Sequence, residues 1–153
     1  MNKQMVGKKH IRSFKIAYYI AAFMAFLVGV AIYAFFRNIN NMILFHFFPK
    51  PLFLASLYNP IKTETIWSNI IIYNLPYGLW CLSGLFLVRG VWLHNEKWRA
   101  IYSGIFITIV MLYVILKIHG ITPGTFDVID LIFMGFFAFI ESFIFYMFIR
   151  RII

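Results

Sequence analysis

Long apolar stretches separated by short charged segments run through most of this 153-residue chain. Residues 16–36 carry no charged side chain, and three further apolar stretches cover residues 76–93, 100–118 and 127–149. About 20 apolar residues suffice for a helix to cross the hydrocarbon core of a bilayer. The pattern therefore predicts an all-α protein, an integral membrane four-helix bundle that forms one transmembrane domain over residues 1–153.

Residues 37–75 have the least regular pattern, and we expect them to form a loop on the outer side. Two prolines flank Lys50 and interrupt any helix there, and the apolar pieces around them are too short to span. Such pieces suit an interfacial or re-entrant segment, and they suit equally a loop packed over the bundle. Residues 66–73, IWSNIIIY, would add a helical turn before a kink at Pro76.

The composition agrees with a membrane environment. Of all residues 63% are hydrophobic and 12% are charged, whereas a soluble domain carries roughly 25% charged residues. The net charge of +9 does not indicate nucleic-acid binding, because the cations lie at the ends of the apolar stretches. The basic residues before residue 16 resemble those of a signal peptide, but the following apolar run exceeds the roughly 7–15 residues of a signal h-region. We therefore expect an uncleaved first helix.

The distribution of the cations predicts the orientation. With the N-terminus inside, four cations lie outside and ten lie inside, namely Lys3, Lys8, Lys9, Arg12, Lys15, Arg89, Lys97, Arg99, Arg150 and Arg151. Cytoplasmic loops carry an excess of Lys and Arg, so this asymmetry places both termini in the cytoplasm. We expect a multi-pass protein of the bacterial inner membrane, with membrane lipids as its partners.

Motifs of soluble enzymes and of metal sites do not occur. Cys81 is the single cysteine, so an internal disulfide and a multi-cysteine metal site are excluded, and a packed, inert thiol is the expectation. The sequence contains no glycine-rich phosphate loop, no HExxH and no nucleophile elbow. We expect neither a metal nor a cofactor.

Three of the five carboxylates lie on the last predicted helix. Asp127 and Asp130 are three residues apart, and Glu141 follows Asp130 by eleven residues, about 20° around the axis and roughly 16 Å along it. All three thus share one face, which we expect to point into the bundle, because acidic side chains in lipid lack partners. Asp127 also suits the helix N-cap, and Glu141 suits either protonation or pairing with an inward-reaching Arg or Lys.

Other polar residues reach the same level if the second and fourth helices are neighbours. Asn74, Tyr77 and Trp80 would lie beside Asp127 and Asp130, with Lys117 and His119 nearby, and would form a polar pocket at the outer leaflet. Trp80, however, suits the interfacial belt and aromatic packing better than a binding cage. Ser83 and Ser103, each beside a glycine, suit close helix packing. The ligand-binding candidates are therefore Asp127, Asp130, Glu141, Asn74, Trp80, Lys117 and His119.

Two short stretches in the second half of the chain carry a family likeness. Residues 123–131, PGTFDVIDL, resemble the signature that precedes the last helix of VanZ-like membrane proteins, and residues 74–80, NLPYGLW, resemble their second span. The chain departs from that signature at Thr125 and Met134, where Arg and Asn are usual. The resemblance implies a four-span cell-envelope protein that lowers susceptibility to a glycopeptide.

Three hypotheses of function follow. The first is a VanZ-like protein whose outer Asp pair binds a lipid or an envelope precursor. The second is a non-catalytic accessory subunit bound to another membrane protein in a larger complex. The third, a membrane-embedded acid/base enzyme using Asp130 and Glu141, ranks last because roughly 16 Å along the helix separates these residues.

Overall fold

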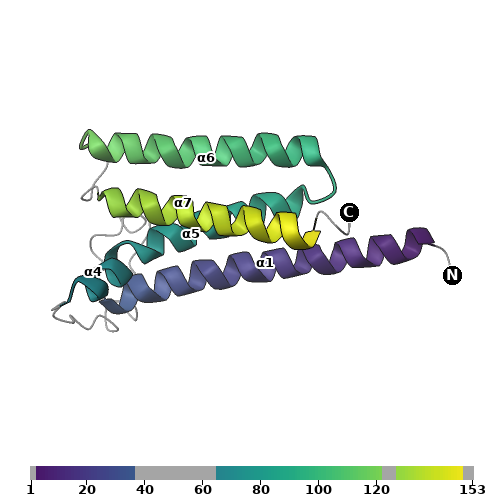
Figure 1. The fold of residues 1–153 in the computed structure, drawn as a ribbon, viewed down its shortest axis with the longest axis horizontal. Coiled ribbons are helices and arrows are strands. Elements are labelled where there is room, and N and C mark those ends of the chain that lie inside the picture. Colours follow the sequence, from purple (N-terminus) through teal and green to yellow (C-terminus); the bar gives the residue numbers. More distant parts are fainter. Residues whose placement is uncertain (1–2, 37–64, 122–126, 150–153) are drawn as a thin grey trace, which may run out of the picture.

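The computed structural model describes residues 3–36, 65–121 and 127–149, and within these ranges it is helical, with no strand (Figure 1). Its elements are α1 (Lys3–Phe36), α4 (Ile66–Tyr73), α5 (Leu75–Val91), α6 (Glu96–Ile118), α7 (Val128–Ile144) and the π-helical turn η2 (Phe145–Ile149). Among the described residues, four helical stretches are long and apolar enough to cross a membrane: Arg12–Phe36, Ile70–Val91, Glu96–Ile118 and Val128–Met147. The all-α class and the presence of four such helices are confirmed.

The helix boundaries differ locally from the predicted spans. The first helix includes the basic head from Lys3 onward, and the third starts at Glu96 rather than at residue 100. The earlier start of α6 follows from Asn95, whose side chain caps the helix by accepting a hydrogen bond from the Trp98 amide at 3.2 Å. Residues 96–99, which the predicted spans left between the second and third helices, therefore form the first turn of α6.

Residues 66–73 are helical, as expected for a helical turn before Pro76, and they form the short helix α4. Thr65 caps α4 by accepting a hydrogen bond from the Ser68 amide at 3.2 Å, and Asn74 separates α4 from α5. Pro76 lies in the first turn of α5, where its missing amide hydrogen costs no helical hydrogen bond. The remainder of the predicted outer segment, residues 37–64, lies outside the described residues.

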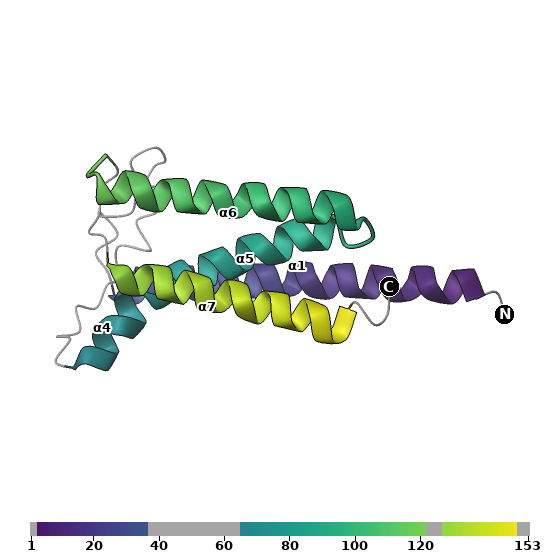
Figure 2. The same cartoon turned by 45° about the horizontal axis from the view of Figure 1, so that its top comes forward.

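Helix α5 lies at the centre of the bundle and contacts α1, α6 and α7 (Figures 1 and 2). It runs parallel to α7 and antiparallel to α1 and α6. The start of α1, the α5–α6 turn and η2 lie at one end of the bundle, and the starts of α5 and α7 lie at the other. We call these the α5–α6 turn end and the Asn74 end.

Three glycines of α5 allow its neighbours to approach closely. An added Cβ would collide with Phe137 of α7 at Gly78 and with Phe106 of α6 at Gly84, and at Gly90 it would press closely against Tyr18 and Tyr19 of α1. Six residues turn a helix by about 600°, so glycines at this spacing face directions about 120° apart. One small residue on each side thus lets α5 pack against three helices at once.

Helix α1 contacts α5 through a narrow stripe of mainly small residues. Buried positions recur every three or four residues, at Tyr18, Ala22, Ala25, Gly29 and Tyr33. Ser83 of α5 donates a buried hydrogen bond to the Ala22 carbonyl at 2.8 Å, in keeping with the expected packing role of this serine. Near the α5–α6 turn end, Tyr18 and Ala22 join Phe86 and Leu93 in a buried apolar cluster.

The outward faces of the helices are apolar. Exposed side chains of α6 and α7 include Ile105, Ile109, Leu112, Ile132, Phe136 and Phe139. Large exposed apolar surfaces are unfavourable in water and suit a hydrocarbon environment. The polar and charged side chains buried within the bundle are therefore the candidate functional residues.

Candidate functional site

Asp127 is the N-cap of α7. Its Oδ1 accepts a hydrogen bond from the Ile129 amide at 3.0 Å, and its backbone is extended, as is usual at this position. Its side chain is exposed, so the expectation that it turns into the bundle together with Asp130 and Glu141 is not met. Capping alone accounts for an oxygen-bearing side chain here.

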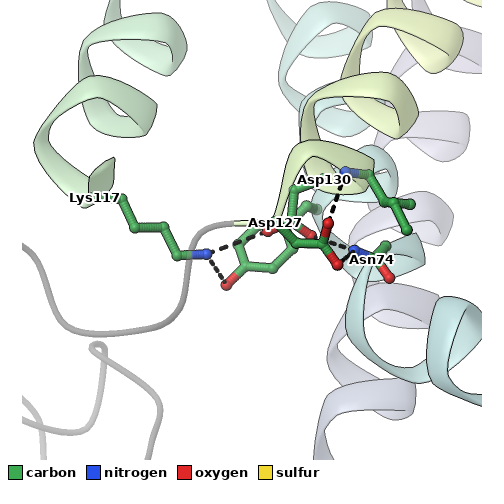
Figure 3. Close-up of polar contacts among 6 residues, drawn as sticks. Asn74, Lys117, Asp127 and Asp130 are labelled. Atoms are coloured by element: carbon green, nitrogen blue, oxygen red, sulfur yellow. Dashed lines mark hydrogen bonds and ion pairs between the residues drawn. The ribbon is translucent and has the colours of Figure 1, made fainter. Parts of the chain in front are cut away.

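Asp130, one turn further along, is buried and joins three helical segments (Figure 3). Its Oδ1 accepts a hydrogen bond from Asn74 Nδ2 at 2.9 Å. Its Oδ2 lies 3.3 Å from Lys117 Nζ, and only 4% of the Lys117 side chain and 8% of the Asp130 side chain are exposed. Each carboxylate oxygen thus has a donor, which makes a buried charge tolerable here.

Lys117 reaches the cluster from the last turn of α6 (Figure 3). Besides Asp130 it contacts Tyr77, whose hydroxyl lies 3.1 Å from Nζ and whose ring centroid lies 4.4 Å from it. Because Tyr77 belongs to α5 and Asp130 to α7, one ammonium group links three helices. We call Asn74, Tyr77, Lys117, Asp127 and Asp130 the outer cluster.

The charges of the outer cluster do not cancel. It contains two carboxylates and one ammonium group, and the ammonium pairs with Asp130. The second carboxylate, Asp127, accepts the capping bond from the Ile129 amide through Oδ1 and a long bond of 3.4 Å from Asn74 through Oδ2, and no cation of the cluster contacts it. Asn74 Nδ2 therefore contacts both carboxylates, and the exposed Asp127 carries the excess negative charge.

Two other candidates lie at the edge of this cluster. Trp80 lies about one turn after Tyr77 on α5, with its ring stacked on Tyr33 at 5.7 Å between centroids and edge-on to Tyr77 at 6.1 Å. His119 follows α6, and its exposed side chain takes part in none of the outer cluster's hydrogen bonds. The Pro123-Gly124 turn of the family resemblance lies outside the described residues.

Glu141 has different partners, at the α5–α6 turn end. It is fully buried, and its Oε2 lies 2.7 Å from Arg89 of α5. Arg89 also donates a hydrogen bond to Ser142 at 3.1 Å, and the Tyr18 hydroxyl lies close to the carboxylate. Pairing with an inward-reaching arginine is therefore the arrangement found, and Glu141 does not join the outer cluster.

Arg99 is a buried cation that lay just outside the predicted third span. Its guanidinium carbon lies 4.2 Å from the centroid of the Phe145 ring, and its Nη1 donates to the Leu93 carbonyl at 2.8 Å. Asn95, a favourable N-cap residue, was the signal that could have placed Arg99 inside a helix. Arg89, Arg99, Glu141 and Phe145 form what we call the inner cluster.

A metal site is not indicated. Within the described part of the chain, no group of three His, Cys, Asp or Glu side chains lies close enough to hold an ion. Cys81 is buried in α5, as a packed thiol would be.

Comparison with known proteins adds no family or fold assignment. No family model, no curated protein and no solved structure matches the chain.

Proposed function

We propose that this chain is a small multi-pass protein of the bacterial inner membrane, VanZ-like in character, whose outer cluster binds a lipid or a cell-envelope precursor. The excess of cations near the α5–α6 turn supports a cytoplasmic location for that end. Since α1 starts and η2 ends on that side, both termini are then cytoplasmic. The Asn74 end and its acidic side chains face outward.

The observation that carries the proposal is the exposed carboxylate of Asp127, which pairs with no cation among the residues that the structure describes. It is exposed, yet Asn74 bridges it to the buried Asp130–Lys117 pair. A carboxylate at the end of a membrane helix attracts a cationic group, and a charge-assisted hydrogen bond to an ammonium is stronger than a neutral one. The favoured ligand therefore carries a primary ammonium, as aminophospholipids and peptide-bearing envelope precursors do.

The family likeness supports the same site. The stretch that resembles the VanZ-like signature contains Asp127 and Asp130, and the second stretch begins at Asn74. These three residues, distant in sequence, meet in the outer cluster. The resemblance extends the proposal to lowered susceptibility to a glycopeptide.

Asp127→Asn tests this function cleanly. Asparagine caps helices as well as aspartate does, so the substitution removes the negative charge and keeps α7 intact. The chain would be expressed in a susceptible bacterium, and the minimal inhibitory concentration of a glycopeptide would be measured. We expect the wild-type chain to raise this concentration and Asp127→Asn to remove the gain at equal protein levels.

Glu96→Gln is the matched control. Glu96 is an exposed carboxylate in the first turn of α6, at the opposite end of the bundle. It should leave the protection unchanged, because it lies far from the outer cluster. Equal protection by the wild-type chain and Asp127→Asn, or no protection by the wild-type chain, would refute the proposed function.

A second candidate function is that of an accessory subunit. Helix α6 packs chiefly on α5, and most of its apolar surface, like that of α7, is exposed. Such faces suit lipid, and they suit equally the helices of a partner membrane protein. Purification from the native membrane in mild detergent discriminates, since an accessory subunit would retain a second chain in stoichiometric amount.

The acid/base enzyme has less support. Asp130 pairs with Lys117 and Asn74, whereas Glu141 pairs with Arg89 at the other end of the bundle. The two carboxylates thus belong to separate clusters, and we do not pursue a joint catalytic role for them.

A further inference from the structure

The inner cluster holds more positive than negative charge. Arg89 and Arg99 approach the same Phe145 ring, with guanidinium carbons 5.5 Å and 4.2 Å from its centroid. The exposed fractions of their side chains are only 15% and 11%, and the single buried carboxylate among them is Glu141. The buried Arg99 and the partly buried Arg89 therefore share one buried anion.

Of the two arginines, Arg99 has the weaker pairing with a carboxylate. The carboxylate that contacts it is Glu96, at 3.7 Å, and the Glu96 side chain is 82% exposed. Such an exposed pair contributes little, whereas the Arg89–Glu141 pair at 2.7 Å has a fully buried carboxylate. A guanidinium has five N–H donors, and beyond the contact with Glu96 one bond from Arg99, to the Leu93 carbonyl, is described.

The depth of the inner cluster suits a lipid headgroup. Next to it, the rings of Trp92, Trp98 and Tyr102 lie against one another, with centroids 5.1 to 5.9 Å apart. Trp and Tyr rings concentrate at the level of the headgroups. Lys15 also lies here and donates to the Val91 carbonyl at 3.2 Å. Phosphate oxygens of the membrane occupy this level, and arginine binds them through paired hydrogen bonds.

We propose that the inner cluster is a binding site for one phosphate group, with Arg99 as its main donor and Arg89 completing the positive field. The phosphate belongs either to a phospholipid headgroup or to a soluble phosphate ester at the α5–α6 turn end. The site is separate from the outer cluster, and it requires no particular function of that cluster.

Lipid retention by the wild-type protein provides the first test. The protein would be solubilised in a neutral detergent and incubated with phosphatidylglycerol or with diacylglycerol of the same acyl chains, and bound lipid would be counted by native mass spectrometry. We expect preferential retention of phosphatidylglycerol with a stoichiometry of one. Equal retention of the two lipids would overturn the proposal. Added inorganic phosphate separates the sources, because displacement of the lipid identifies a soluble phosphate site and persistence identifies a headgroup site.

Variants of α6 then assign the site to Arg99. Arg99→Gln should lower the affinity for phosphatidylglycerol by roughly tenfold, the scale of a lost charge-assisted contact. Arg99→Lys keeps the charge without the guanidinium fork, so its affinity for phosphatidylglycerol should lie between those of the wild type and Arg99→Gln. Lys97→Gln removes an exposed cation from the same helical turn and should bind as the wild type does.

Two outcomes of the variant series would overturn the assignment. The first is wild-type affinity in Arg99→Gln with its helical circular dichroism unchanged. The second is an equal loss in Lys97→Gln, which would indicate nonspecific attraction to a basic surface. If Arg99→Gln fails to fold, Arg99→Lys against Lys97→Gln still decides between a specific site and that surface.

Discussion

Asp130 and Glu141 lie on one face of α7, eleven residues apart, and their partners lie at opposite ends of α5. Asn74, immediately before α5, contacts Asp130, and Arg89, in the last turn of α5, contacts Glu141. Because α5 and α7 run parallel, the two polar contacts join the helices at both ends. A parallel pair whose outward faces are apolar thus gains a defined register from two buried carboxylates.

Loss of the Lys117 ammonium should destabilise the bundle. Lys117→Met leaves the Asp130 carboxylate buried without its cation, which costs roughly 3–5 kcal/mol of unfolding free energy. Chemical denaturation in detergent micelles, followed by circular dichroism, measures the change. His119→Ala, two residues away and exposed, should change the same quantity by less than about 0.5 kcal/mol.

The double variant Lys117→Met, Asp130→Asn should recover much of that loss, because it removes both charges of the pair. Groups in direct contact give non-additive free energies of this kind. If Lys117→Met proved no less stable than His119→Ala, the buried ion pair would not contribute to the stability of the bundle.

The carboxylate of Glu141 should contribute more to the stability of the bundle than the neighbouring Ser142 hydroxyl does. Glu141→Gln leaves Arg89 and Arg99 without a buried anion, and we expect a loss of roughly 3–5 kcal/mol of unfolding free energy. Ser142→Ala removes the hydrogen bond from Arg89 to an exposed hydroxyl, and its cost should not exceed about 1 kcal/mol. Thermal unfolding of the two variants in one detergent would establish the order, and the reverse order would contradict the inner cluster.

Two glycines should respond to alanine in opposite directions. At Gly78 an added Cβ collides with the Phe137 ring and lies 3.2 Å from the Phe133 carbonyl oxygen, so Gly78→Ala should cost about 1–3 kcal/mol of unfolding free energy. At Gly104 nothing lies within 4 Å, and Gly104→Ala should stabilise α6 by up to about 1 kcal/mol. The measurement is denaturant unfolding of both variants. Equal effects would argue against close packing of α5 on α7.

Impermeant thiol labelling tests the proposed orientation. His94 and His119 are both exposed and flank the two ends of α6. In a Cys81→Ser background, which removes the only thiol, His119→Cys should react with an impermeant maleimide added to spheroplasts. His94→Cys should react only after the membrane is permeabilised. The opposite pattern would mean that the Asn74 end faces the cytoplasm.

Local rules accounted for much of what the sequence predicted. Apolar stretches of sufficient length located four helices, and Asp127 matched an N-cap because capping depends on neighbouring residues alone. The common face of Asp130 and Glu141 followed from helical periodicity and agrees with their burial. The start of α6 at Glu96, four residues before the predicted span, depends on the N-cap Asn95, which is a local signal. The charged side chains that follow Asn95 concealed this signal in the apolar pattern.

Only the tertiary structure decided which polar groups meet. That Asn74 and Lys117 contact Asp130, that Arg89 contacts Glu141, and that Arg99 is buried all depend on α5 lying between three helices. Helices that are apolar on every face carry little pattern to indicate which side meets which neighbour, since lipid and protein are equally apolar surroundings. Which faces pack together is therefore decided by the shapes of the helices. In this protein, Gly78, Gly84 and Gly90 have no side chain and so allow three different helices to approach α5.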